Sequence, residues 1–319
     1  MRGAVLLAVL IAVPDLADAQ GARPYGSLPP CQFTHVDRIM RLAADCSTSA
    51  SIVIPDGETL DGGGHTIYAV EGSGKPFSGG VVVARGGTAS IVNTTISAIS
   101  LTGECHTGAD RLRGIYFEDA AGEIRRNVVV NVNQGSSACV EGNAIEVRSR
   151  DLEGAARTVH IERNVIDRYQ KSGIVIHGHV DAVIESNALG TSAAQRFVPA
   201  NGIQVGPGAR ARIENNLVFG NSFPADDAAG TAILLIDTAP GTLVVRNVIR
   251  GNADVGIHVF ADAVIVESNE LDDDGPDGAY DVGIVNLGDG NIFRNNAIRG
   301  YRSRYSGVQD DGGSTLQIE

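Results

Sequence analysis

The fold is decided by a short pattern, Gly173-Ile174-Val175-Ile176, which returns one repeat later as Gly202-Ile203-Gln204-Val205. A small residue, an aliphatic residue, a variable residue and usually a second apolar residue recur in steps of about 24–30 residues. Six further copies begin at these residues: Gly114, Ala144, Ala232, Gly256, Gly283 and Gly307. Alternation within each copy puts the two apolar side chains on one face, which predicts a short β-strand.

A second element follows the first seven copies: an aliphatic residue, two variable residues and an asparagine. These asparagines are Asn127, Asn164, Asn187, Asn216, Asn247, Asn269 and Asn296. Asn93 is expected to begin the series. Asparagine tolerates the left-handed conformation of a tight bend, and stacked asparagines can hydrogen-bond from coil to coil. Sevenfold recurrence favours this structural role over catalysis or glycosylation.

Units of this length are too short to fold alone and bury their apolar sides only by stacking. The chain has 40 glycines, no tryptophan and only 5% aromatic residues. Such a composition suits narrow layers of valine, isoleucine and alanine. We therefore predict an all-β protein, a parallel β-helix of about ten coils.

The first residues have the features of an export signal. Arg2 precedes an apolar run at residues 4–13, and Ala17-Asp18-Ala19 offers a small-x-small cleavage site. A run of about ten residues is too short to span a bilayer, which needs about twenty, so the alternative of a membrane anchor is disfavoured. We expect a secreted or periplasmic protein that is not inserted into a membrane.

The chain is predicted to have three parts: a signal peptide at 1–19, an N-terminal cap at 20–51 and the β-helix at 52–319. The cap is expected to contain a short helix over about residues 34–44, because four apolar residues there have helical spacing: Val36, Ile39, Met40 and Ala43. Such a helix would cover the open core and unpaired strand edge at the end of a β-helix.

The stretch at residues 54–67, IPDGETLDGGGHTI, resembles the opening coil of the pectate-lyase-like, right-handed parallel β-helix superfamily. The repeats resemble its generic coils. This resemblance implies that the Gly-Ile strands form the first sheet and that the asparagine bend lies between the second and third sheets. It also implies a substrate groove along the outside of the first sheet. The superfamily includes lyases, hydrolases, epimerases and tailspikes, so the fold does not decide the activity.

The register implied by the resemblance places long, variable loops between the third and first sheets. These loops are expected at residues 134–142, 191–200, 221–230 and 272–281. Four cysteines allow three disulfide connectivities. Cys105 and Cys139 fall in this loop column on neighbouring coils, and Cys31 and Cys46 flank the cap helix, so we expect these two pairs.

One polar patch stands out on the expected outer face of the first sheet. Five side chains should meet there: Tyr116, Glu118, Glu146, Arg148 and His177. A lyase needs a base, a cationic group for the enediolate and a donor for the leaving oxygen, and Arg148, His177 and Tyr116 could supply them. The two glutamates could hold a cation or orient Arg148. The alternative is a solvated face with cross-strand ion pairs, in particular Glu118 with Arg148.

A calcium ion is the one cofactor that the sequence suggests. An acidic loop supplies five carboxylates: Asp272, Asp273, Asp274, Asp277 and Asp281. The loop lacks the spacing of an EF-hand, and an ordinary solvated turn is the alternative.

The net charge of −13 argues against nucleic acid and anionic lipid as partners. Two functions remain open. The first hypothesis is an exported lyase-type enzyme that acts on an acidic polysaccharide at the patch. The second is a non-catalytic β-helix that binds a surface polymer or a protein. An expected exposed apolar stripe would suit such binding; its members are Val175, Leu234, Ile236 and Phe260. The oligomeric state stays open.

Overall fold

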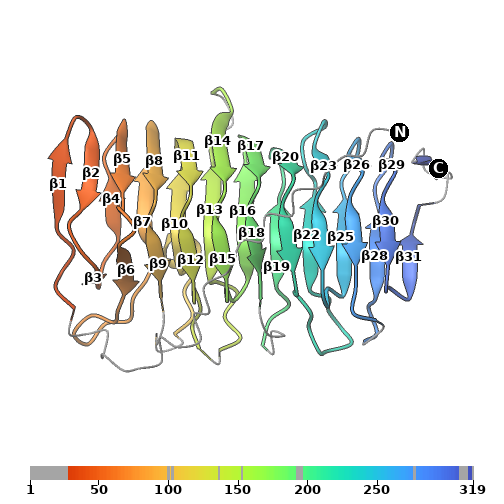
Figure 1. The fold of residues 1–319 in the computed structure, drawn as a ribbon, viewed down its shortest axis with the longest axis horizontal. Coiled ribbons are helices and arrows are strands. Elements are labelled where there is room, and N and C mark those ends of the chain that lie inside the picture. The colour runs from red at the N-terminus through yellow and green to blue at the C-terminus, as the bar shows by residue number, and fades with distance from the viewer. Residues whose placement is uncertain are drawn as a thin grey trace, which may run out of the picture.

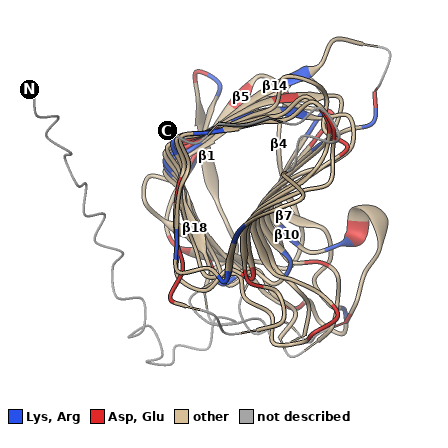
Figure 2. Cartoon of the chain, turned by 90° about the vertical axis from the view of Figure 1, so that its right-hand side faces the viewer, with Lys and Arg blue, Asp and Glu red and all other residues tan. Residues whose placement is uncertain are grey.

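The computed structural model describes residues 28–98, 101, 104–135, 137–151, 154–191, 197–275, 278–308 and 315–317. The predicted signal peptide at 1–19 lies outside these residues. Three sheets run along the molecule side by side (Figure 1), and in the view along the axis they form the three sides of each coil (Figure 2). Within the described residues, no helix is long and apolar enough to cross a membrane.

The first sheet holds the Gly-Ile strands, as the resemblance implied. Its members in chain order are β4 (Ile52–Ile54), β7 (Gly80–Arg85), β10 (Arg113–Glu118), β13 (Asn143–Ser149), β16 (Ser172–Gly178), β19 (Asn201–Val205), β22 (Thr231–Ile236), β25 (Val255–Phe260), β28 (Val282–Asn286) and β31 (Ser303–Ser306). Every pair in it is parallel.

The second sheet precedes the asparagine bend in each coil. Its members are β1 (Phe33–Val36), β2 (Ile39–Leu42), β5 (Glu58–Asp61), β8 (Thr88–Val92), β11 (Ala121–Arg125), β14 (Arg157–Glu162), β17 (Val180–Glu185), β20 (Arg210–Glu214), β23 (Leu243–Val245), β26 (Ile265–Glu267), β29 (Ile292–Arg294) and β32 (Thr315–Gln317).

The third sheet follows the bend. Its members are β3 (Cys46–Thr48), β6 (Thr66–Ala69), β9 (Thr95–Ser97), β12 (Val128–Val130), β15 (Val165–Asp167), β18 (Ala188–Gly190), β21 (Leu217–Phe219), β24 (Val248–Arg250), β27 (Glu270–Asp272) and β30 (Ala297–Arg299). One short 3-10 helix, η3 (Gly108–Asp110), lies in the loop before β10. The four predicted long loops all lie between a third-sheet strand and the next first-sheet strand, which confirms that part of the register.

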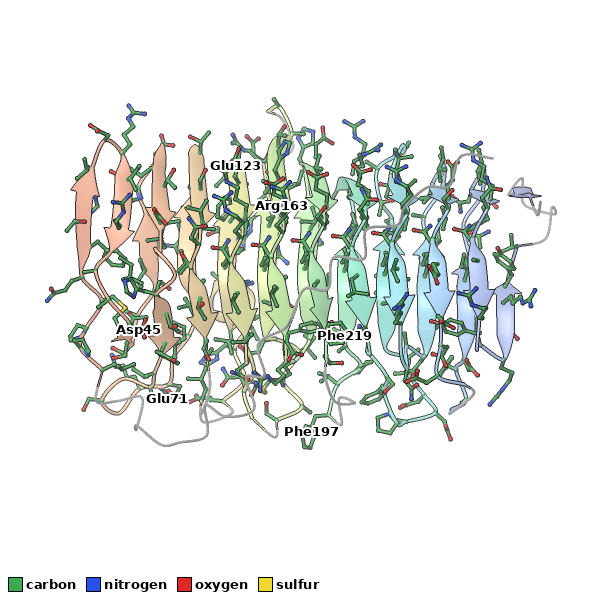
Figure 3. All side chains as sticks on the ribbon, viewed as in Figure 1. Asp45, Glu71, Glu123, Arg163, Phe197 and Phe219 are labelled. Carbon is green, nitrogen blue, oxygen red and sulfur yellow. A yellow bond between two sulfur atoms is a disulfide. The ribbon has the colours of Figure 1, made fainter. Side chains whose placement is uncertain are left out.

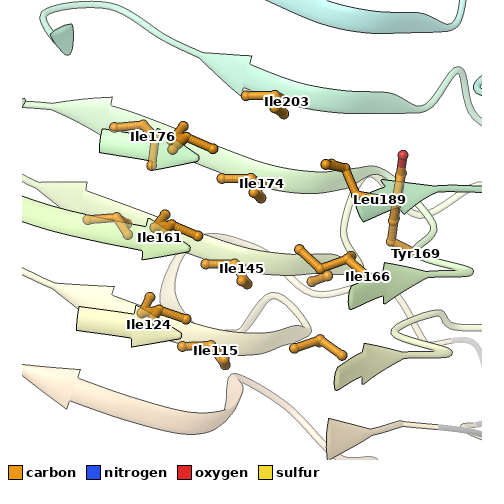
Figure 4. Close-up of a cluster of buried hydrophobic side chains, with 14 of the residues drawn as sticks. Ile115, Ile124, Ile145, Ile161, Ile166, Tyr169, Ile174, Ile176, Leu189 and Ile203 are labelled. Atoms are coloured by element: carbon orange, nitrogen blue, oxygen red, sulfur yellow. The ribbon is translucent and has the colours of Figure 1, made fainter. Parts of the chain in front are cut away.

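The core is a stack of like residues from successive coils. Ile115, Ile145, Ile174 and Ile203 are cross-strand partners in the first sheet and are fully buried, and Figure 4 shows them one above another. Burying an aliphatic side chain stabilises a fold by about 1.5–3 kcal/mol. The repeat therefore closes a continuous core although no single coil could hold one.

The asparagine ladder is confirmed, but the left-handed residue is its neighbour. In the bend of β17 and β18, Ser186 has a φ of 55°, while Asn187 points inward and is buried. Asn187 Nδ2 donates to Asn216 Oδ1 at 2.9 Å, and Asn164 Nδ2 donates to Asn187 Oδ1 at 3.0 Å. The bend thus needs a left-handed residue and a buried amide at adjacent positions.

The expectation that Asn93 begins the ladder is wrong by one position. Asn93 is the left-handed residue of its bend, with a φ of 51°, and Thr94 occupies the ladder position. The Thr94 backbone N–H donates to Asn127 Oδ1 at 3.1 Å.

The predicted N-terminal helix is wrong: residues 33–42 form an antiparallel hairpin. Val36 pairs with Ile39 across a two-residue turn, in which Asp37 and Arg38 have φ values of 48° and 62°. Two consecutive left-handed residues make the turn that matches the twist of a hairpin. The apolar spacing therefore reflects alternation in two short strands. The strand β2 then pairs with β5, so the hairpin extends the second sheet.

Both expected disulfides are present. Cys31 is bonded to Cys46 and ties the hairpin to the third sheet, and Cys105 is bonded to Cys139 between neighbouring loops. Cys105 of the second bond lies in the same loop as η3, and this loop covers part of the first sheet.

Candidate functional site

The strand register brings the predicted site residues together. Glu118 is the cross-strand partner of Arg148, and Arg148 is the partner of His177, so the three side chains form one row across β10, β13 and β16. Arg85 on β7 extends the row beside Glu118. All four are at least partly exposed. The predicted adjacency of Glu118, Arg148 and His177 is confirmed.

Tyr116 and Glu146 form a second row, two positions earlier on the same strands, and this row is buried. Tyr116 and Glu146 are each 1% exposed. The prediction placed them on an open polar surface, and the structure corrects this. Outward-facing residues are buried here because residues 108–111 cover them; this segment contains the short helix η3, which projects beside β7 and β10 in Figure 2.

Arg113 is the reason why this loop can close over the sheet. Its guanidinium is fully buried, lies 4.3 Å from the centre of the Tyr116 ring and donates to the backbone carbonyls of Gly108, Ala109 and Arg111. It also pairs with the Glu146 carboxylate at 2.7 Å. A buried arginine needs such partners, because an unpaired charge away from water is strongly unfavourable.

Our prediction from the sequence missed Arg113, although a signal was present. A polar residue precedes the small residue of several Gly-Ile copies, and the register aligns these residues into one buried column: Arg113, Asn143, Ser172, Asn201 and Thr231. A polar residue that recurs at the start of a buried strand indicates an internal hydrogen-bond network.

Glu146 joins the buried row to the exposed row. Burial by itself raises the pKa of Glu146, but the hydrogen bond and charge of Arg113, with Asn143 and Arg148, outweigh it and hold that pKa below its usual value. Asn143 Nδ2 donates to Glu146 at 2.9 Å, and Arg148 Nε lies 3.4 Å from Glu146 Oε1. Glu146 is therefore ionised and holds Arg148 from beneath.

His177 lies beside Arg148 on an open part of the face. Burial, followed by the positive charge of Arg148, lowers the pKa of His177 below its usual value, and Glu146 opposes this only in part. His177 is thus neutral at pH 7. Its ring packs on Gly206, where an added Cβ would come within 2.9 Å of His177 Cδ2. The glycine leaves room for the imidazole.

Glu118 is engaged in ion pairs at the edge of the row. Its carboxylate lies 3.3 Å from Arg85 Nε and 3.6 Å from Arg150 Nη2. Glu118 and Arg148 are cross-strand neighbours, but the ion pairs found for Glu118 in the described residues are with Arg85 and Arg150. The side chain of Arg148 contacts Glu146 instead.

Tyr116 keeps its proton. Burial raises the pKa of Tyr116 to about 12. The positive charge of Arg113 opposes this rise, and the negative charges of Glu118 and Glu146 add to it. The Tyr116 hydroxyl is buried. Because residues 108–111 cover Tyr116 in this structure, a polymer bound on the outer face of the first sheet would not contact its hydroxyl.

The predicted apolar stripe exists only on the later coils. Val175 is buried, Leu234 and Ile236 are half-buried, and Phe260 is exposed, so the stripe begins beyond His177. Leu287, in the next coil, is 64% exposed. The face is therefore charged on β7, β10, β13 and β16 and apolar on β22, β25 and β28.

In the described residues, no three carboxylates of the suggested calcium loop come close enough together to share a metal ion. Asp277 lies outside the described residues. Asp272 lies 3.8 Å from Arg299 Nε, and Asp273 and Asp281 accept backbone N–H groups. The calcium hypothesis stays a prediction.

A different group of potential metal ligands lies within the described residues: Cys105, Cys139 and Glu141. The two sulfurs are joined in a disulfide, and the buried Glu141 carboxylate accepts the backbone N–H groups of His106 and Leu112 at 2.8 and 2.5 Å. A disulfide sulfur is not the thiolate that binds metals, so this group holds the loop in place.

Comparison with known proteins agrees with the architecture. A family model described as "right handed beta helix region" matches residues 79–319. An uncharacterized protein of Bacillus subtilis (strain 168), YclG, is 23% identical over 195 residues, which are 58% of this chain and 31% of YclG. This chain thus spans about a third of the length of that curated relative.

Solved structures also match over most of the chain. The Dettilon tailspike protein is 15% identical, with a TM-score of 0.40, over 88% of this chain and 61% of that one. A double mutant of the periplasmic alginate epimerase AlgG is 11% identical, with a TM-score of 0.44, over 95% of this chain and 76% of that one.

Proposed function

Because the chain belongs to the right-handed β-helix family, we propose that it is an exported, carbohydrate-active protein with lyase-type activity on an acidic polysaccharide. The reaction is placed on the outer face of the first sheet, at Arg148 and His177. The observation that carries the proposal is the pairing of a neutral, partly exposed histidine with an adjacent arginine whose position is held by a buried carboxylate.

The chemistry is a β-elimination on a uronate. His177 takes the proton from the carbon next to the carboxylate, and the electron pair forms a carbon–carbon double bond as the bond to the glycosidic oxygen breaks. Protonated His177 then gives the proton to the leaving oxygen. Arg148 offsets the negative charge that develops on the carboxylate. Glu146, itself held by Arg113, positions Arg148 from below, and Glu118 pairs with Arg85 and Arg150 at the edge of the row.

The test is to incubate the mature protein with a panel of polyuronates and follow the absorbance of unsaturated ends, with and without calcium. We expect product from at least one polymer. His177→Ala and Arg148→Ala should each lower kcat by about 100-fold or more, the usual size of a general base or charge-stabilising contribution. Calcium dependence that disappears in Asp272→Asn would support the metal hypothesis for the acidic loop.

Matched controls lie on and just after the second-sheet strand β14. His160→Ala and Arg163→Ala remove exposed residues of the same types far from the row, and Figure 3 shows Arg163 in the half of the molecule away from the loops. Both should retain full activity. Activity that survives the double variant His177→Ala/Arg148→Ala would eliminate this site.

A second candidate function is polymer or protein binding without catalysis. The observation that favours it is the exposed apolar row of Phe260 and Leu287 with half-buried Ile236. Contiguous exposed apolar surface usually marks a partner or ligand. No product from any polyuronate, together with retention of the protein on a polysaccharide affinity gel, would favour this function over the lyase.

A further inference from the structure

A pocket separate from the row of charged residues lies in the loop column at the other end of the molecule. It has a volume of about 310 Å³ and is lined by three successive loops, at residues 222–226, 252–254 and 278–280. These loops lead into β22, β25 and β28, whereas His177 lies on β16. Ligand pockets for small molecules have volumes from about 300 Å³ upward, so this one suits a ligand of one or two rings.

The walls of the pocket are held by buried hydrogen bonds. The Asp254 carboxylate, 5% exposed, accepts the backbone N–H of Phe223 at 3.0 Å and that of Gly230 at 2.6 Å. It therefore fixes both ends of the first loop. The Arg302 side chain donates to the Gly278 carbonyl at 2.9 Å, which holds the third loop. A pocket with fixed walls avoids the entropic cost of ordering loops around a ligand.

The lining combines aromatic and polar groups. Tyr280 is 40% exposed, and Phe223 and Pro224 add apolar surface beside it. Asp226 and Asn252 contribute side chains that can bond to hydroxyl groups. An exposed aromatic ring next to hydrogen-bonding groups suits the two surfaces of a pyranose ring, one apolar and one rich in hydroxyls.

The charge of the pocket selects among sugars. Asp226 and Asp254 both line it, and the whole chain carries a net charge of −13. A uronate carboxylate placed there would be repelled, since charges of the same sign interact unfavourably at short range. We infer that this pocket binds an uncharged sugar unit, at a site distinct from the proposed lyase site. The inference stands on the pocket itself and does not depend on lyase activity.

The experiment uses saturation-transfer NMR and calorimetry with neutral trisaccharides (cellotriose, maltotriose and mannotriose) and a triuronate as the charged comparison. At least one neutral trisaccharide should bind, with transfer to the C–H protons of one sugar ring. Tyr280→Ala should weaken that binding by about tenfold or more, and Asp226→Ala by a similar factor.

Phe197→Ala and Asp227→Ala are the matched controls, because both residues are exposed, lie in neighbouring or the same loops and do not line the pocket. They should leave binding unchanged, and all four variants should unfold at the wild-type temperature. Three results would overturn the inference: no binding of any neutral trisaccharide at millimolar concentration, tighter binding of the triuronate, or binding unaffected by both Tyr280→Ala and Asp226→Ala.

Discussion

At the scale of single residues, the candidate site depends on one buried ion pair. Arg113 and Glu146 are both about 1% exposed and pair at 2.7 Å. Two buried charges stabilise a fold only when each has a partner, and the loss of one leaves the other unpaired. The exposed pairs of this chain, such as Arg299 with Glu270, are in water and contribute far less.

Arg113→Met should therefore lower the free energy of unfolding by about 3–5 kcal/mol, because it leaves the Glu146 carboxylate buried without its main partner. Urea unfolding followed by circular dichroism measures this. Arg299→Met, the exposed control, should change it by less than about 1 kcal/mol. Equal effects of the two substitutions would contradict a special role for the buried pair.

The same pair predicts an acid limb of stability. The pKa of Glu146 lies below its ordinary value of 4.5 in the folded chain, so the unfolded chain binds a proton more readily. The stabilisation is present above pH 4.5 and is lost as pH falls through the lowered pKa. Glu146→Gln should flatten the decline of stability in this acid range, at a cost in stability at neutral pH.

His177 offers a direct test of its coupling to Arg148. Arg148 helps to hold the pKa of His177 below 6.5, after burial, so Arg148→Gln should raise that pKa. NMR titration of the His177 ring protons gives the value without relying on activity. Arg163→Gln removes a distant arginine and should leave the titration unchanged. If the lyase proposal holds, the acid limb of kcat/KM moves to higher pH in Arg148→Gln as well.

At the scale of elements, each coil depends on its bend. The ladder asparagine accepts from the amide of the coil before it and donates to the next, while the residue before it takes the left-handed conformation. The two requirements fall on adjacent positions and have different physical causes, a buried hydrogen-bond network and a backbone conformation.

These two causes can be separated by substitution. Asn187→Ala should lower the free energy of unfolding by about 2–4 kcal/mol, because the Asn164 backbone N–H loses its acceptor, the Ile161 carbonyl loses a donor and the side-chain ladder is broken on both sides. Ser186→Gly should be neutral or stabilise by up to about 1 kcal/mol, because glycine adopts a φ of 55° without strain. A large loss in Ser186→Gly would contradict this assignment.

At the scale of the whole molecule, the β-helix behaves as a one-dimensional stack. Each coil contacts chiefly the coils before and after it, so stability is approximately a sum over coils and their interfaces. The core positions of neighbouring coils are alike: Ile203 pairs with Ile233, and Ile233 with Ile257. One coil can therefore replace another in the stack.

Deletion of residues 233–256 joins Ala232 to Ile257 and removes one complete coil. The product should fold, with a free energy of unfolding lower by about 1–4 kcal/mol, the share of a segment this long. On the proposals above, polyuronate lyase activity should persist because β10, β13 and β16 are untouched. The pocket loses Asn252 and Asp254, so neutral sugars should no longer bind. An aggregated product would show that coils are not interchangeable here.

The repeat in the sequence was enough to predict the β-helix and the asparagine ladder, whereas the first sheet and the disulfide pairs were predicted with the register that the resemblance implies. Period and spacing are converted into adjacency by a parallel stack: once Ile115 lies on Ile145, Glu118 must lie beside Arg148. The hairpin at residues 33–42 was mistaken for a helix, because short apolar spacing fits both periods and only pairing with β5 decides between them.

Burial on the outer face was decided by the tertiary structure alone. Strand alternation says which way Tyr116 and Glu146 point, but not that a loop from the preceding coil closes over them and pins itself to Arg113. The same holds for the pocket, whose walls come from the loops of three successive coils. Period is a local property of the sequence, whereas the path of a loop depends on which partners its backbone finds in the assembled stack.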